Sequence, residues 1–131
     1  GTANSSGGGF VSFGNTVING GSMVSLSKCR ASNHGGGFAL NQDLRVENAS
    51  SLNVEHGTAG GSGGCFISRG KTFINGGSRV HLSICAAWLG AAVSAFHIKV
   101  LDSGWLVLQA SGNSSVVSAA RLTLQRSKMT L

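Results

Sequence analysis

The chain has 131 residues, of which 21 are Gly and none is Pro, and only 11% of them are charged. A hydrophobic fraction of 41% excludes intrinsic disorder, which needs low hydrophobicity and high charge. The absence of Pro excludes a collagen-like chain. The length fits a single domain, and the formal net charge of +6 raises the question of an anionic partner.

A repeat begins after a short leader, residues 1–6. The segment Gly7–Phe10 (GGGF) returns as Gly35–Phe38 (GGGF) and as Gly63–Phe66 (GGCF), so these Phe residues lie 28 positions apart. A fourth copy, Gly90–Val93, comes one residue early. A fixed period of this length is typical of architectures in which each repeat stacks on the next.

A second element lies between these Gly-rich corners and keeps the same period. The segment Ile18–Leu26 returns as Val46–Val54 and as Ile74–Leu82, with a worn copy at Val100–Leu108. Apolar and polar residues alternate in each copy, which predicts a short strand with one buried face. Overlaying the copies gives five apolar columns: Phe10, Phe38, Phe66 and Val93; Ile18, Val46, Ile74 and Val100; Val24, Leu52, Val80 and Leu106; Leu26, Val54, Leu82 and Leu108; Ala31, Ala59 and Ala87.

Short strands, Gly corners and the 28-residue period together predict an all-β fold, a right-handed parallel β-helix (β-solenoid) of about 4–5 coils. We expect a single domain over residues 1–131, with the coils in 7–115 and a partial coil or basic C-terminal arm in 116–131. A β-sandwich is the alternative, because it also has frequent turns. It gives no reason for the same residue to return after 28 positions.

The segment Leu26–Phe38, which contains Cys29 and Ala31, resembles the tandem repeats of chlamydial polymorphic outer-membrane proteins. Those repeats carry a Phe-x-x-Asn element followed by Gly-Gly-Ala-Ile. The chain departs from them, because Leu or Val replaces the first Phe, Cys or Gly replaces the Asn, and Phe replaces the Ile. It is also similar to Gly-rich β-helix repeats in large algal and dinoflagellate proteins. The resemblance covers residues 7–93 and implies a β-helix with a role in adhesion or assembly.

Polysaccharide lyases and hydrolases with this fold gather carboxylates on one outer face, to bind Ca²⁺ or to act as general acid and base. The carboxylates here fall at different repeat positions, and only those of Asp43 and Glu47 could form a pair. The histidines occupy four different positions too, so stacking does not assemble a metal site. We therefore expect no enzyme activity and no catalytic, cofactor-binding or metal-ligating residues. The residues concerned are Asp43, Glu47, Glu55 and Asp102, and His34, His56, His81 and His97.

The chain has three Cys residues, none in a metal-binding spacing. Cys29 and Cys85 share a column with Gly57 between them, and two coils separate them by more than a disulfide can span. Cys65 lies at a Gly corner, far from that column in the repeat. We expect all three to be buried small apolar side chains.

The candidate partner-binding residues lie toward the C-terminal end, where the repeat decays. Trp88 falls in a corner, and Trp105 falls at an outward position. Either the two rings pack under a local loop or the tail, or they anchor a partner. Residues 103–131 are basic and lack acidic residues, which favours an acidic protein or an anionic surface at the C-terminal arm. The candidates are Trp88, Trp105, Arg121, Arg126 and Lys128.

These features predict a non-catalytic structural or interaction module within a larger assembly, bound to other protein subunits. A surface or fibrous structure, or an accessory subunit of an organellar membrane complex, fits this description. The alternative is a carbohydrate-binding or polysaccharide-cleaving β-helix protein. We expect no transmembrane segment, because no apolar run is long enough. We expect no nucleic-acid partner, because the chain has no Tyr and its Phe residues mostly fall in inward columns.

Overall fold

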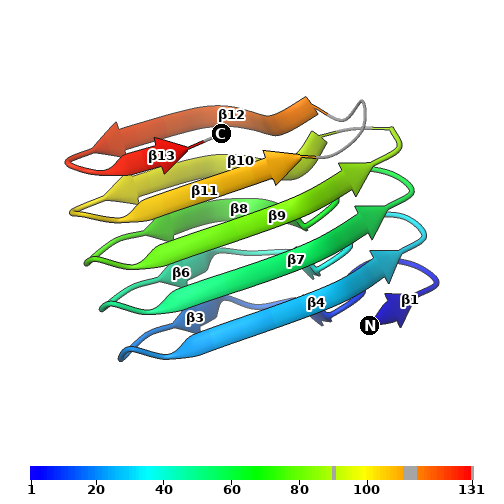
Figure 1. The fold of residues 1–131 in the computed structure, drawn as a ribbon, viewed down its shortest axis with the longest axis horizontal. Coiled ribbons are helices and arrows are strands. Elements are labelled where there is room, and N and C mark those ends of the chain that lie inside the picture. Colours follow the sequence, from blue (N-terminus) through cyan, green and yellow to red (C-terminus); the bar gives the residue numbers. More distant parts are fainter. Residues whose placement is uncertain (90, 111–114, 131) are drawn as a thin grey trace.

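The computed structural model describes residues 1–89, 91–110 and 115–130, and these form strands, turns and bends without a helix. The chain winds into coils that stack on one another, and each coil contributes to two facing sheets (Figure 1). All strand pairs are parallel. Within these residues no helix could cross a membrane.

Sheet A, in front in Figure 1, has six strands in the order β1-β4-β7-β9-β11-β13. Neighbours in this sheet come from successive coils, so the sheet grows by one strand with each turn of the chain. Its strands are β1 (Thr2–Ala3), β4 (Met23–Ala31), β7 (Ser51–Ala59), β9 (Arg79–Ala87), β11 (Trp105–Ala110) and β13 (Lys128–Thr130).

Sheet B lies behind it and has seven strands in the order β12-β10-β8-β5-β2, with β6 paired to both β3 and β8. The first two coils cross this sheet as two short strands, and later coils cross it as one long strand. Its strands are β2 (Phe10–Ser12), β3 (Thr16–Ile18), β5 (Phe38–Leu40), β6 (Leu44–Val46), β8 (Phe66–Ile74), β10 (Ala91–Leu101) and β12 (Ser115–Gln125).

The register of these strands confirms the predicted β-solenoid. Phe10 pairs with Phe38 and Phe38 with Phe66, so residues 28 apart lie side by side. Their rings stack with centroids 5.1 and 4.9 Å apart. Val93 continues this column in β10. The parallel pairing also excludes the sandwich alternative, whose sheets are antiparallel.

The core is the space between the two sheets, which the apolar columns fill. In β4, β7 and β9, the alternation of inward and outward side chains shifts by one residue partway along the strand. Lys28, His56 and Ile84 hold the left-handed backbone conformation, with φ of 52°, 57° and 52°. Each therefore adds a second consecutive outward residue, after which Cys29 and its equivalents point inward again. The largest fully buried side chains are Phe38, Phe66, Leu40, Leu44, Leu52, Ile74, Leu82, Ile98, Leu106, Leu108, Val46 and Val54.

The sequence places Cys65 far from the column that contains Cys85, and this expectation is wrong, because Cys65 and Cys85 form a disulfide with Cα atoms 5.1 Å apart. The two sheets converge at the Gly-rich end of the coil, so positions far apart in the repeat meet across it. Gly57 shows how tight this end is, since a Cβ there would lie 3.0 Å from the Cys65 Sγ. Cys29 is the free cysteine and is buried, as expected.

The two ends of the chain take part in the sheets. In the leader, Thr2 and Ala3 form β1 and pair with β4. Residues 115–125 form β12 on β10, and residues 128–130 form β13 on β11. The basic residues at the end of the chain are therefore held on the last coil.

Candidate functional site

Trp105 begins β11 and faces outward, as the repeat alignment predicts. Arg79 on β9 and Lys128 on β13 are its register neighbours. The Arg79 Cζ lies 4.3 Å and the Lys128 Nζ 4.9 Å from the ring centroid. The indole Nε1 donates a hydrogen bond of 3.4 Å to the Thr130 Oγ1. The cation–π contact with Lys128 and the hydrogen bond to Thr130 thus hold Trp105 against the C-terminal segment, and the contact with Arg79 joins it to β9.

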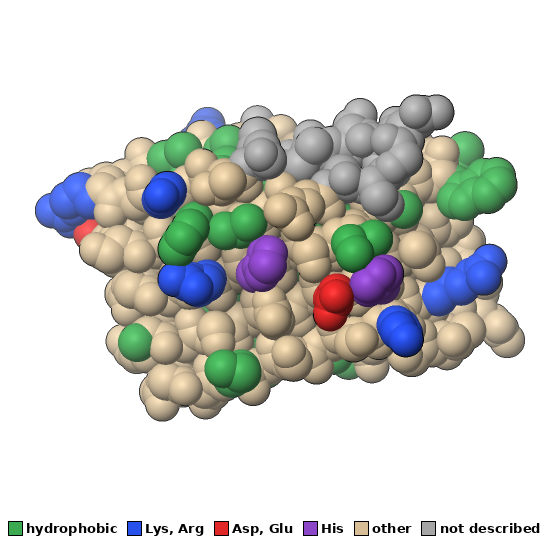
Figure 2. Space-filling model, viewed as in Figure 1, with side chains coloured by type: hydrophobic (Ala, Val, Ile, Leu, Met, Phe, Trp, Pro, Cys, Tyr) green, Lys and Arg blue, Asp and Glu red, His purple; other side chains and the backbone are tan. Residues whose placement is uncertain are grey.

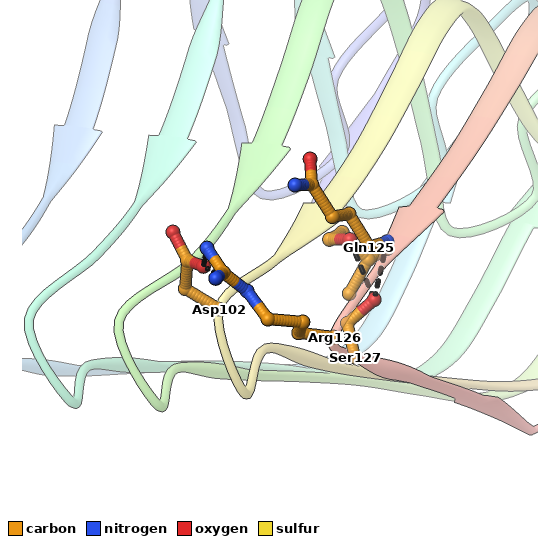
Figure 3. Close-up of polar contacts among 5 residues, drawn as sticks. Asp102, Gln125, Arg126 and Ser127 are labelled. Atoms are coloured by element: carbon orange, nitrogen blue, oxygen red, sulfur yellow. Dashed lines mark hydrogen bonds and ion pairs between the residues drawn. The ribbon is translucent and has the colours of Figure 1, made fainter.

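Arg126 is tied to the turn between β10 and β11 (Figure 3). Its Nη2 and Nε donate to the Asp102 Oδ1 at 2.6 and 3.1 Å. The adjacent Ser127 Oγ donates to the Val100 carbonyl at 2.6 Å and accepts from the Gln125 N–H at 3.1 Å. These contacts order the last corner of the solenoid, so the charge of Arg126 is already paired.

Trp88 and Leu89 lie side by side at the corner that follows β9. Their side chains are 88% and 86% exposed. Their backbone is held, because Trp88 N–H donates to the Ala59 carbonyl at 3.1 Å and Leu89 N–H to the Gly61 carbonyl at 3.3 Å. In Figure 2, apolar side chains protrude at this end of the molecule, and the basic side chains on sheet A lie apart from one another.

A cavity of about 510 Å³ lies beside the ring of Trp88. It lies where β4 and β7 end, beside the corner that follows β9. Its lining residues are Arg30, Ala31, Ser32, Thr58, Ala59, Gly60 and Trp88.

The five candidate residues do not form one surface. Trp105, Arg126 and Lys128 line one open cavity of about 480 Å³ near the start of β11. Trp88 lies at the opposite end of sheet A, about 30 Å away along nine residues of strand. Arg121 lies on β12 in sheet B, where it pairs in register with His97. The exposed apolar corner at Trp88 therefore lies apart from two basic regions, one around Trp105 on sheet A and one around Arg121 on sheet B.

Sequence reasoning missed the outward residues of sheet B. Phe73 lies between Arg45 and Lys99 in register, and their charged groups lie 5.0 and 5.8 Å from its centroid. Phe13 and Phe96 are also exposed. The expectation that Phe residues mostly point inward is therefore wrong for three of the six. Strand alternation gave the signal for Phe73, because it directly precedes the inward residue Ile74.

His97 is enclosed by basic neighbours on the same face. It is only 7% exposed, and its Nε2 lies 3.4 Å from the Thr123 Oγ1. Desolvation lowers the pKa of His97 below its ordinary value, and the positive charges of Lys99, Arg121 and Lys71 lower it further. The imidazole is therefore held in its neutral form at neutral pH.

The carboxylates serve different parts of the molecule. The Asp43 Oδ1 accepts a hydrogen bond of 2.8 Å from the backbone N–H of Lys71. Asp102 is paired with Arg126, and the Glu55 Oε1 lies 3.6 Å from the His56 Nδ1. In residues 1–89, 91–110 and 115–130, no three His, Cys, Asp or Glu side chains gather as a metal site would require.

Comparison with known proteins adds no relative from which a function could be transferred. No protein-family model matches the chain, and no curated protein or solved structure is significantly similar to it. The resemblance to chlamydial and algal repeats stays a prediction from the sequence.

Proposed function

We propose that this chain is a non-catalytic interaction module, a β-solenoid that works inside a larger protein assembly. The observation that carries this proposal is the corner formed by Trp88 and Leu89, two large apolar side chains exposed side by side. Exposed apolar groups of this size are unfavourable in water, and Trp is enriched among the residues that dominate protein interfaces. The partner is another protein subunit with an apolar pocket for the indole ring.

The rigidity of the corner supports the same proposal. The backbone of Trp88 and Leu89 is hydrogen-bonded to the coil below, so the two side chains project from a fixed base. A preorganised anchor loses little conformational entropy when its partner binds. The corner therefore combines apolar area with a defined geometry.

The size of the native particle that carries this chain tests the proposal. We expect a particle much larger than the 13.2 kDa of the chain alone. The double substitution Trp88→Ser and Leu89→Ser should release the chain from it. Met23→Ser, which removes another exposed apolar side chain from sheet A, should leave it intact. A native particle of the free chain's mass would overturn the proposal.

Carbohydrate binding is the second candidate, and the cavity beside Trp88 favours it. An aromatic ring next to the hydroxyls of Ser32 and Thr58 and the guanidinium of Arg30 suits a sugar ring. None of the four carboxylates lines this cavity, which favours binding over cleavage. A panel of neutral oligosaccharides would test it by calorimetry. Binding that Thr58→Val weakens, while the native particle stays intact, would favour this candidate.

A further inference from the structure

The outer face of sheet B carries a group of basic side chains brought together by the stacking of coils. Lys71 on β8 and Arg121 on β12 flank His97 on β10 in register. Lys99 shares this outward orientation with His97, because Ile98 between them points into the core. Residues far apart in the sequence thus become neighbours about 4.8 Å apart from strand to strand.

In the part of the chain that the structure describes, no ion pair neutralises the charges of this group. Each of the four carboxylates is described, and none forms an ion pair with Lys71, Lys99 or Arg121. The two acidic residues nearest in the repeat, Asp43 and Glu47, flank β6 one coil below β8, and the Asp43 Oδ1 accepts a hydrogen bond of 2.8 Å from the backbone N–H of Lys71. Lys71 and Arg121 are exposed and Lys99 is half-buried. The face therefore keeps a local excess of positive charge available to a ligand.

The spacing of the charges follows the axis of the solenoid. Arg45, Lys71, Lys99 and Arg121 lie on β6, β8, β10 and β12 of four successive coils, in two neighbouring register columns, Arg45 with Lys99 and Lys71 with Arg121. The exposed Arg69 adds a further cation on β8. The cations rise by about 4.8 Å per coil. An extended polymer with a negative charge on successive units would match such a row. A single small anion would use only part of it.

The geometry points to a binding site for a linear anionic polysaccharide, whose sulfate or carboxylate groups contact Lys71, Lys99 and Arg121 along the stack. This site lies on a different face from the Trp88 corner and does not depend on the function proposed for it. Single-stranded nucleic acid fits less well, because it needs a row of free aromatic rings. The ring of Phe73 is already in contact with Arg45 and Lys99, and Phe96 offers one exposed ring in this coil.

Binding of dextran sulfate, with uncharged dextran as the control polymer, tests the site. We expect dextran sulfate to bind at about 50 mM salt, more weakly as salt rises, and dextran not to bind. The double substitution Lys71→Gln and Arg121→Gln should reduce the affinity at least about tenfold. Lys28→Gln with Arg79→Gln removes the same charge from exposed positions on sheet A and should leave the affinity nearly unchanged.

The titration of His97 gives a second readout, observed by NMR. A sulfate group near Lys71 and Arg121 would offset their charge, so the pKa of His97 should rise on binding. Equal losses in the two double variants would overturn the site, because binding would then follow net charge alone. Absence of binding, or tighter binding of single-stranded DNA than of dextran sulfate, would also overturn it. Both double variants keep Trp88 and Leu89, so the native particle that tests the proposed function should stay intact whether or not dextran sulfate binds.

Discussion

Thr72 carries a hydroxyl that is buried without a hydrogen-bond partner. Its side chain is 2% exposed and lies in register between Leu44 and Ile98, both in the core. Thr72→Val keeps the shape and removes the unpaired polar group, so we expect the free energy of unfolding to rise by about 1 kcal/mol. Urea denaturation measures this change. Thr123→Val, at a half-buried position on β12, should give no gain, and a loss at Thr72 would show that its hydroxyl is satisfied.

Ala49 is a non-glycine residue in the left-handed backbone region, with φ of 58°. Gly21 and Gly77 hold the equivalent corner position in neighbouring coils, with φ of 74° and 73°. We expect Ala49→Gly to raise the free energy of unfolding by roughly 0.5–1 kcal/mol, because Gly adopts this conformation without steric strain.

The reverse substitution, Gly77→Ala, is the matched control for this corner. A Cβ on Gly77 would meet no atom within 4 Å, so its effect reports the backbone conformation alone. We expect a loss of similar size in the same denaturation experiment. A neutral result for both variants would show that the turn relaxes to relieve the strain.

At the scale of elements, the disulfide joins the residue before β8 to the end of β9 and closes a loop with a sequence separation of 20. Its removal by Cys65→Ala with Cys85→Ala should lower the free energy of unfolding by about 3 kcal/mol, because the unfolded chain gains freedom. Cys29→Ala should cause a smaller loss. Peptide mapping without reductant should find Cys65 linked to Cys85, and a link to Cys29 would contradict the assignment.

At the scale of the whole molecule, acid should destabilise the fold. The formal charge rises from +6 to +10 when all four histidines are protonated. The pKa of His97 lies below its ordinary value of 6.5 in the folded protein, so the unfolded chain binds the proton more readily. Its contribution to stability is therefore complete above pH 6.5 and falls as the pH drops toward the folded pKa.

Thermal unfolding midpoints between about pH 8 and pH 5 measure this dependence. His97→Gln should flatten the profile below pH 6.5. An unchanged slope in His97→Gln would assign the acid sensitivity to general charge repulsion.

Much of the solenoid could be predicted because its determinants are local and periodic. Strand alternation assigns the inward residues of each copy, and the 28-residue period aligns copies such as Val24 and Leu52, which pair in the structure. The outward position of Trp105 followed from the same alignment. The extra outward residue at Lys28, His56 and Ile84 is also periodic, but a backbone conformation has no clear residue signature there.

The sequence by itself thus determined the coil, its columns and the order in which residues stack, because these depend on short-range alternation and a fixed period. Only the tertiary structure decided which residues meet across the coil or on one outer face. Cys65 reaches Cys85 because the two sheets converge, and Lys71 meets Arg121 around His97 because three coils stack. The disulfide depends on a distance across the coil, and the contacts around His97 join residues 26 and 24 positions apart, which the 28-residue period does not predict.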